Sequence, residues 1–369
     1  MPPYPRHIHI IAFDIPYPPD YGGVIDIWYK IKALHHLGIQ ITLHVFLYPN
    51  KYPHEEIESY CTHIYYYPRN TLLRHHLSPL PYIVKSRTSG ALIQNILANP
   101  SPVLMEGIHS THHLTALMKA GIPCYVRMHN IESKYYYYLF TLEKNILKKL
   151  FYFTEYKKLT HYEKIVFKSS GILFISPEDK KNFTAPVKSI ILYPFHGMEA
   201  VDKYESKMQI LFHANFAVEE NRIAAMQIAS LADAIHLPII IAGKYADTLD
   251  IHNSNSHLIV FSNPSHEHMQ SLLFSSAIHL LPLPQPTGIK LKLIQAIFAA
   301  KYIIVSNEMA QNFPWQSQVL TYQTPGDIPV IIDNIINGNI PAADYTSLHR
   351  ILCDQENAQK LIDFIFINS

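Results

Sequence analysis

The sequence predicts two α/β domains, each built on a parallel β-sheet with helices on both faces. The chain has 369 residues, of which 48% are hydrophobic, so it is too long for one ordinary core and apolar enough to fill two. Short apolar runs alternate with helical stretches along both halves of the chain. Alternation of this kind is typical of parallel sheets covered on both faces.

The first half opens with a strand, a proline-rich loop, a helix and a second strand, which is a Rossmann-like beginning. The expected elements are strands at 7–13, 40–48, 63–67, 103–106, 124–128 and 171–175, and a first helix at 22–37 that stops at Gly38.

A polar stretch with proline and glycine at 191–209 is expected to link a domain at 1–190 to a second domain at 210–369. Residues from Tyr345 onward are expected to be helical, and the pattern leaves open whether they close the second domain or pack back on the first. The other elements expected in the second half are strands at 210–213, 239–242, 258–261, 277–281 and 302–306, and helices at 221–236, 266–275 and 290–299.

Charge and cysteine content exclude several classes of protein. A formal net charge of +1, from 30 basic and 29 acidic side chains, gives no field for sequence-independent binding of nucleic acid. The N-terminus lacks the pattern of a signal peptide, and no apolar run approaches the roughly 20 residues that cross a bilayer. Three widely spaced cysteines favour a reducing compartment. We therefore expect a cytoplasmic protein.

The 23 histidines do not indicate a metal centre. Pairs such as His35-His36 and His75-His76 are adjacent residues, whose side chains point in different directions on a helix or a strand. No metal site is predicted.

Residues 287–306 carry the clearest binding signal. Gly288 ends a loop, Lys290 and Lys292 lie in the first turn of a predicted helix, and Gln295 follows one turn later. The free backbone N–H groups of a helix start favour anions. The segment therefore predicts a site for a phosphorylated ligand.

Three further motifs of the first half end strands or open helices, where α/β folds place ligand sites. Gly22 and Gly23 let a bound group approach the backbone, although a structural turn accounts for them equally well. Arg127 and His129 follow one predicted strand, and Glu106 ends another. Histidine and arginine there suit sugar hydroxyls and phosphates, or they organise the loop.

In the second half, Asn215 follows the first predicted strand, and Gly243 and Lys244 end the next. Lys244 joins Lys290 and Lys292 as a candidate partner of a phosphate, the alternative for each being a solvated surface lysine.

These motifs resemble those of glycosyltransferases of the GT-B fold, in which two Rossmann-like domains face each other across a cleft, and in particular the large retaining family-four group. That family often has Gly-x-x-x-Lys-x-x-Glu-Ala at the donor site, and Gly288, Lys292 and Ala296 match it. Gln295 stands where the family usually has a glutamate, and Thr287 replaces an earlier acidic residue. An amide oxygen still accepts a hydrogen bond, but without charge.

The resemblance implies a metal-independent, retaining transfer of sugar from a nucleotide-diphospho-sugar substrate to a saccharide or lipid-linked acceptor, in cell-surface glycan synthesis and without a cofactor. The C-terminal domain would bind the donor and the N-terminal domain the acceptor. His129, Arg127 and Glu106 are then the candidate catalytic residues. The candidate donor-binding residues are Gly22, Gly23, Asn215, Gly243, Lys244, Gly288, Lys290, Lys292 and Gln295.

Two alternatives remain open at this point. The replacements at Thr287 and Gln295 favour a catalytically weakened homologue that serves as a binding or partner subunit. A sugar-nucleotide epimerase on the same fold would act without an acceptor.

Residues 134–168 are rich in tyrosine and hold eight lysines against three glutamates. The segment suits either an anionic membrane surface, where a lipid-linked acceptor resides, or a helix pair with a buried aromatic face and a solvated basic one.

Overall fold

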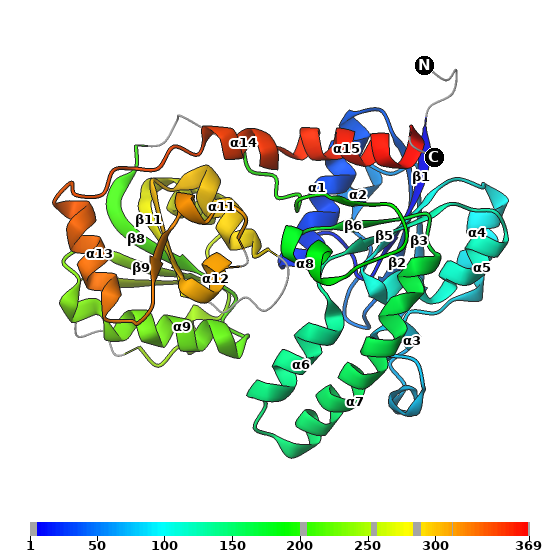
Figure 1. Cartoon of the computed structure of the whole chain (residues 1–369), viewed down its shortest axis with the longest axis horizontal. Coiled ribbons are helices and arrows are strands. Elements are labelled where there is room, and N and C mark those ends of the chain that lie inside the picture. Colours follow the sequence, from blue (N-terminus) through cyan, green and yellow to red (C-terminus); the bar gives the residue numbers. More distant parts are fainter. Residues whose placement is uncertain (1–5, 200–204, 252–256, 283–288, 312, 368–369) are drawn as a thin grey trace. The chain divides into compact units, whose positions relative to one another are not determined.

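The computed structural model describes residues 6–199, 205–251, 257–282, 289–311 and 313–367. The chain divides into two compact units. The first unit runs to Gly197 and resumes at Leu352, and the second begins at Met198 and ends at Ile351. Each contains one parallel sheet between helices (Figure 1), which confirms the predicted fold class.

Among the described residues, the first unit has seven parallel strands in the order β3-β2-β1-β4-β5-β6-β7. They are β1 (His7–Ala12), β2 (Gln40–Leu47), β3 (His63–Pro68), β4 (Val103–Glu106), β5 (Cys124–Met128), β6 (Gly171–Phe174) and β7 (Ser189–Ile191). The first six confirm the predicted strands. The last is three residues long, too short to show a period, and the sequence pattern did not reveal it.

Helices cover both faces of this sheet. They are α1 (Gly22–His36), α2 (Glu55–Glu58), α3 (Tyr82–Lys85), α4 (Gly90–Ala98), α5 (Leu114–Lys119), α6 (Glu132–Leu142), α7 (Ile146–Tyr162), α8 (Pro177–Asn182) and α15 (Asp354–Phe366), with 3-10 turns η1 (Leu73–Leu77), η2 (Ile108–His113) and η3 (Glu163–Lys168).

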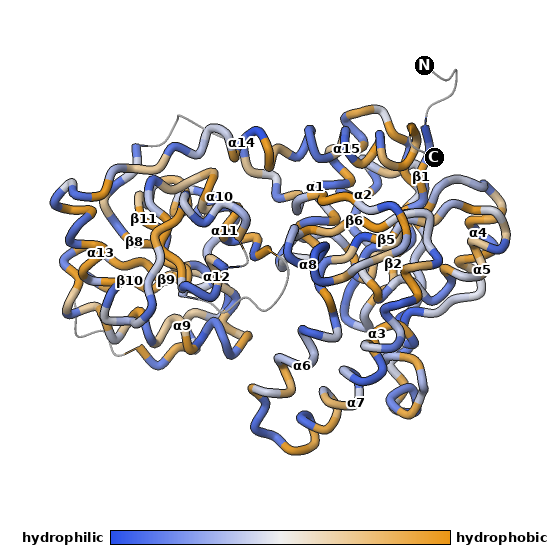
Figure 2. Tube along the Cα trace, in the orientation of Figure 1, coloured by the Kyte–Doolittle hydropathy of each residue, from blue (hydrophilic) through white to orange (hydrophobic). Residues whose placement is uncertain are grey.

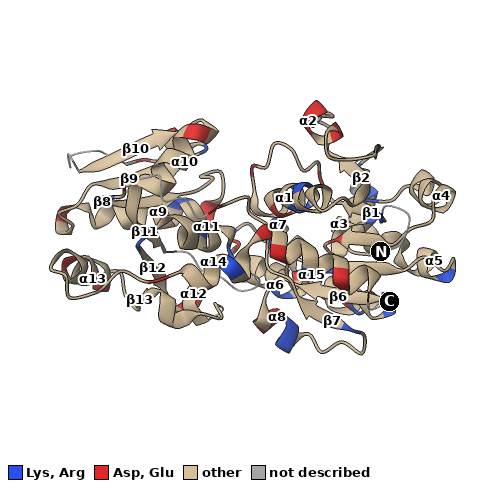
Figure 3. Cartoon of the chain, turned by 90° about the horizontal axis from the view of Figure 1, so that it is seen from above, with Lys and Arg blue, Asp and Glu red and all other residues tan. Residues whose placement is uncertain are grey.

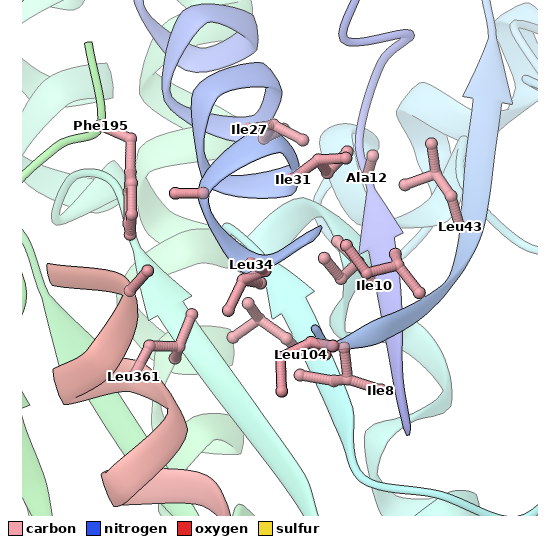
Figure 4. Packing of buried hydrophobic residues seen from close by; sticks show 14 of the residues in the cluster. Ile8, Ile10, Ala12, Ile27, Ile31, Leu34, Leu43, Leu104, Phe195 and Leu361 are labelled. Carbon is pink, nitrogen blue, oxygen red and sulfur yellow. The ribbon is translucent and has the colours of Figure 1, made fainter. Parts of the chain in front are cut away.

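The core follows from the alternation of side chains along each strand. Ile8 and Ile10 of β1 face α1 and α15, where they join the cluster that contains Ile31 and Leu361 (Figure 4). Ile11 belongs to a second cluster, which α4, α5 and η3 cover. Each fully buried aliphatic side chain contributes roughly 1.5–3 kcal/mol, so both faces of the sheet hold helices firmly.

The C-terminal helix α15 belongs to the first unit, which decides the alternative that the sequence left open. Its first residue, Asp354, accepts the backbone N–H groups of His196, at 3.1 Å, and Gly197, at 2.8 Å. These bonds join the start of α15 to the segment that follows β7.

Within its described residues, the second unit has six parallel strands in the order β10-β9-β8-β11-β12-β13. They are β8 (Lys207–His213), β9 (Ile239–Gly243), β10 (Leu258–Ser262), β11 (Ser276–Leu281), β12 (Tyr302–Ser306) and β13 (Leu320–Tyr322). The first five confirm predicted strands, and the short β13 was not predicted.

The helices of the second unit are α9 (Glu219–Ser230), α10 (His266–Ser275), α11 (Leu291–Ala299), α12 (Asn307–Gln311), α13 (Asp327–Ile336) and α14 (Thr346–Leu352), with 3-10 turns η4 (Ala232–Ala234), η5 (Ala246–Thr248) and η6 (Gln316–Gln318). The helix predicted at 221–236 is shorter than expected, because α9 ends at Ser230 without a glycine or proline to mark its end.

Both sheets reverse their strand order beside the first strand, between β1 and β4 and between β8 and β11. In open parallel sheets, ligands bind outside the carboxyl ends of the strands at such a reversal. Lysine and arginine are interspersed with acidic residues over the elements of each unit (Figure 3).

Candidate functional site

Buried charged side chains gather at the carboxyl ends of β4 and β5. Glu106 is the last residue of β4, Arg127 lies in β5 and His129 follows that strand. Helix α1 adds Asp26 and Lys30, one turn apart and both buried. These five residues are called the charged cluster below.

Short hydrogen bonds connect the charged cluster. Lys30 Nζ donates to Glu106 Oε1 at 2.6 Å and to Asp26 Oδ2 at 3.1 Å. Arg127 donates through Nε and a terminal nitrogen to the two oxygens of Asp26, at 2.7 and 2.9 Å. His129 Nε2 lies 2.8 Å from Glu106 Oε2. The three candidate catalytic residues from the sequence therefore lie together, joined through Asp26 and Lys30.

The cluster keeps its carboxylates ionised. Burial by itself would raise the pKa of Asp26, but Arg127, Lys30 and His129 hold that pKa below its ordinary value. Burial would likewise raise the pKa of Glu106, but Lys30 and His129 lower it below its ordinary value. Burial lowers the pKa of Lys30 although both carboxylates oppose it. Two buried anions thus balance two buried cations.

Arg127 is fully buried. Besides Asp26, its guanidinium donates to the carbonyl oxygens of Leu192 at 3.0 Å and Tyr193 at 3.1 Å. Asp26 in turn accepts the N–H of Phe195 at 2.7 Å. This pair therefore fastens the segment after β7 to α1 and β5, and we assign Arg127 to positioning the cluster.

His129 is the member of the cluster that reaches the surface, with 11% of its side chain exposed. If Nε2 carries the proton and donates to Glu106, Nδ1 is left as an acceptor. The nearest Asp26 oxygen is 3.7 Å from Nδ1, too far for a hydrogen bond. The ring can therefore accept a proton from a group outside the protein.

Asp26, Glu106 and His129 offer three metal-ligand atoms within 4.8 Å of one another. Lys30 and Arg127 already neutralise both carboxylates, however, and a divalent ion would have to approach these two cations. The donor set therefore fits an ion-pair network better than a metal site.

Sequence reasoning missed Asp26 and Lys30. Both stand in a helix whose other buried residues are almost all apolar, and a carboxylate and an ammonium four residues apart on such a face are a signal. That signal is weak, because an exposed helical ion pair has the same spacing.

Gly22 and Gly23 open α1 beside the charged cluster. The preceding residue, Tyr21, makes no side-chain cap to the helix, so no such cap occupies the first N–H groups. A Cβ at Gly23 would lie 2.6 Å from the ring of Phe13, and that ring contacts the His129 ring at a centroid distance of 5.5 Å. This close approach explains the second glycine.

In the second unit, Lys290 and Lys292 stand at the start of α11. Lys290 Nζ lies 3.2 Å from Glu220 Oε1, and Lys292 Nζ donates to Asn221 Oδ1 at 3.1 Å. The Lys292 ammonium also lies 5.4 Å from the centre of the Phe212 ring. The two lysines therefore meet the first turn of α9 at the carboxyl edge of the sheet.

The pKa of Lys292 is lowered. Burial, and then the neighbouring charge of Lys290, lower the pKa of Lys292 to about 7, against the opposing effect of Glu220. Lys292 is half-buried by solvent exposure, and a partly desolvated lysine next to another cation is stabilised in its charged form when an anion binds beside it.

The remaining candidates shape the loops around the lysines. Asn221 donates to the carbonyl oxygen of Asn215 at 2.7 Å. Gly243 ends β9 with φ of 148°, and a Cβ there would overlap the carbonyl oxygen of Ala214, so only glycine fits. Lys244 is exposed at the same edge.

Gln295 is half-buried on α11, one turn beyond Lys292. Thr287 and Gly288 lie outside the described residues. Asn215, Gly243, Lys290, Lys292 and Gln295 thus belong to one edge of the second unit, whereas the candidate catalytic residues belong to the first.

None of the helices in the described part of the chain is both long enough and apolar enough to cross a membrane.

Comparison with known proteins gives a consistent picture of the fold. No model of a known protein family matches the chain. An uncharacterised 44.6 kDa protein in the cps region of Klebsiella pneumoniae is 25% identical over 329 residues, which are 80% of this chain and 82% of that protein.

Solved structures of glycosyltransferases match almost the whole chain. Sucrose-phosphate synthase from Thermosynechococcus elongatus has a TM-score of 0.64 and 13% identity, covering 98% of this chain and 97% of the other. WaaG, a glycosyltransferase involved in lipopolysaccharide biosynthesis, has a TM-score of 0.57 and 13% identity, covering 97% and 99%. HepE from Anabaena, in complex with UDP, has a TM-score of 0.53 and 10% identity, covering 98% and 95%.

These likenesses span both units, each of which contains one parallel Rossmann-like sheet. The chain therefore has the GT-B fold, the fold of the glycosyltransferases that it matches.

Proposed function

We propose that this protein is a glycosyltransferase that moves a sugar from a nucleotide-diphospho-sugar to a saccharide or lipid-linked acceptor in the synthesis of a cell-surface glycan. The capsule-region relative and the lipopolysaccharide enzyme support the pathway class. A cytoplasmic location agrees with the three free cysteines, Cys61, Cys124 and Cys353.

The observation that carries this proposal is the placement of Lys290 and Lys292 together at the start of α11, against the first turn of α9. A lysine whose pKa burial and a second lysine lower to about 7, at the N-terminal turn of α11, is a site prepared for a dianionic group. The diphosphate of a nucleotide sugar supplies such a group, and the complex of HepE with UDP supports the choice of nucleotide.

The first unit would supply the acceptor side. In the transfer, the acceptor hydroxyl oxygen bonds to the anomeric carbon, the bond from that carbon to the diphosphate oxygen breaks, and the hydroxyl proton leaves. His129 Nδ1 would take this proton while Glu106 holds Nε2. Lys290, Lys292 and the helix start would stabilise the departing diphosphate without a metal. Retention at the anomeric carbon, which remains part of the proposal, requires the acceptor oxygen to attack from the face that the diphosphate leaves.

Thermal stabilisation by UDP and GDP tests donor binding. We expect one of them to raise the Tm of the wild-type protein, Lys292→Ala to abolish the rise, and the exposed control Lys301→Ala to retain it. If neither nucleotide nor any common nucleotide sugar changes the wild-type Tm, the donor site is wrong.

A second candidate is a homologue that binds the donor without transferring the sugar. Gln295 in place of the expected acidic residue favours it, and so does Glu220, whose carboxylate already pairs with Lys290. Mass spectrometry separates the two functions: a transferase releases nucleoside diphosphate and forms a heavier acceptor, whereas a binding subunit is stabilised by the nucleotide and forms neither product.

A further inference from the structure

Helices α6 and α7 form a hairpin that extends away from the sheet of the first unit (Figure 1). Aromatic residues join its two helices: Tyr136 contacts Tyr152, Tyr137 contacts Tyr156 and Phe140 contacts Phe153, at ring-centroid distances of 6.0, 5.2 and 5.4 Å. These ring contacts hold the two helices together, while Tyr137 and Phe153 remain 49% and 38% exposed.

The aliphatic residues at the free end of the hairpin are exposed. Ile146 is 81% exposed, Leu147 79%, Leu150 59% and Leu142 55%. We call these four residues the hairpin tip. Ile146 and Leu150 are one turn apart at the start of α7, and Figure 2 shows apolar segments alternating with hydrophilic ones at this end. A concentration of exposed aliphatic side chains at one end of a projecting element marks an interaction site.

The charges around the hairpin tip are positive. Lys144 and Lys148 are exposed at the tip, and Lys149 beside them is half-buried. Lys134 and Lys157 are exposed farther from the tip, along α6 and α7. Of the carboxylates on α6, α7 and their connection, Glu132 and Glu155 are buried and Glu143 is half-buried. Surfaces that enter the headgroup region of an anionic bilayer combine lysine with aliphatic residues such as leucine and isoleucine. Protein interfaces are instead depleted in lysine and enriched in tryptophan, tyrosine and arginine.

The backbone at the tip also suits an environment of low dielectric constant. Asn145 Oδ1 accepts the N–H groups of Leu147, at 3.0 Å, and Lys148, at 3.2 Å. Glu143 Oε1 accepts the N–H of Asn145 at 2.8 Å. Uncapped N–H groups at a helix start cost free energy on leaving water, and these three already have partners.

We propose that the hairpin tip inserts into the surface of an anionic membrane, with the surrounding lysines on the phosphate groups of its lipids. This inference does not depend on the proposed enzymatic activity. Because α6 has 11 residues and starts three residues after His129, the tip lies about 16 Å from the end of α6 nearest to the charged cluster. A lipid-linked sugar could span that distance.

Cosedimentation with lipid vesicles tests the proposal. We expect the full-length protein to bind mixed phosphatidylcholine–phosphatidylglycerol vesicles and to bind pure phosphatidylcholine vesicles much more weakly. Ile146→Asp with Leu150→Asp should weaken binding roughly a hundredfold, and Lys144→Gln with Lys148→Gln about thirtyfold. The matched control is Ile223→Asp with Val330→Asp, which changes two aliphatic residues of the second unit that are 60% and 59% exposed.

A spectroscopic variant locates the contact. Leu147→Trp should shift its emission to the blue and be quenched by brominated lipids when anionic vesicles are added, whereas Val330→Trp should not respond. Equal vesicle binding by the wild-type protein and the aspartate variant would overturn the proposal. So would a concentration-dependent dimer, seen by sedimentation velocity without lipid, that the aspartate variant abolishes.

Discussion

Glu106 Oε2 and His129 Nε2 lie 2.8 Å apart at the carboxyl edge of the first sheet, and the other oxygen of Glu106 bonds the buried Lys30. The carboxylate is thus shared between an ammonium and an imidazole. This arrangement orients the His129 ring. It leaves Nδ1, the second ring nitrogen, for contact with a group that binds at the surface.

His129→Asn should therefore lower kcat by roughly 10²–10⁴-fold with little change in donor KM, because the substitution removes a general base and leaves the second unit unchanged. Steady-state release of nucleoside diphosphate in the presence of acceptor measures it. His36→Asn, an exposed histidine at the end of α1, is the control. Full activity of His129→Asn would show that the ring is not the base.

Asp26→Asn should destabilise the first unit by roughly 3–5 kcal/mol at neutral pH, since it leaves Arg127 and Lys30 short of a buried counter-charge. Urea unfolding of a Trp315→Phe background, in which Trp28 reports on the first unit, measures the loss. The exposed Glu55→Gln is expected to unfold like the parent protein.

The pH dependence of that difference follows from the pKa of Asp26, which is lowered in the folded protein. Its contribution is complete above the unfolded value of about 3.9 and is lost as the pH falls below it. The gap between Asp26→Asn and the parent protein should therefore close in acid. A difference in unfolding free energy that grew as the pH fell would contradict the conclusion that Asp26 is ionised in the folded protein.

Lys292 predicts a second pH dependence. Its folded pKa of about 7 lies below the ordinary value of 10.5, so its burial costs stability below that pKa, and the cost fades as the pH rises toward the unfolded value. Lys292→Met should stabilise the free protein at neutral pH. A bound diphosphate favours the charged lysine, so UDP affinity should fall up to about tenfold per pH unit above neutrality.

Isothermal titration calorimetry in buffers of different ionisation enthalpy measures both the affinity and the proton uptake. Lys292→Arg keeps its charge throughout this range and should remove the uptake. If the wild-type protein and Lys292→Arg take up the same number of protons on binding UDP, the titrating group is not Lys292.

Gly243→Ala should unfold or strongly destabilise the second unit, because a Cβ at φ of 148° would overlap the Ala214 carbonyl oxygen. Gly338→Ala is a matched control, since its φ is 73° but nothing lies within 4 Å of the added Cβ. It should cost only about 1–2 kcal/mol of backbone strain. Hydrogen exchange of peptides from β8 and β9 reports the difference.

Much of the fold was predictable because each strand is a continuous apolar run between turn signals. Strands β4, β5 and β12 have the predicted limits. The two strands that were missed, β7 and β13, have three residues each, and their pairing depends on neighbouring strands rather than on any local pattern.

The candidate site was predictable only in part. Glu106, Arg127 and His129 could be proposed because each stands at or near the end of a strand. Asp26 and Lys30 could not, since an acid and a base four residues apart look the same in sequence whether they face water or the interior.

The sequence by itself determined two Rossmann-like sheets and the lysine-bearing start of α11, because these depend on local periodicity and on residue types at helix ends. Only the tertiary structure decided that α15 returns to the first unit and that the guanidinium of Arg127 pairs with the carboxylate of Asp26. It also decided that the segment rich in lysine and tyrosine forms a hairpin with an aliphatic tip. Burial, pairing of charges and exposure are properties of contacts between residues far apart in the chain, and no local pattern encodes them.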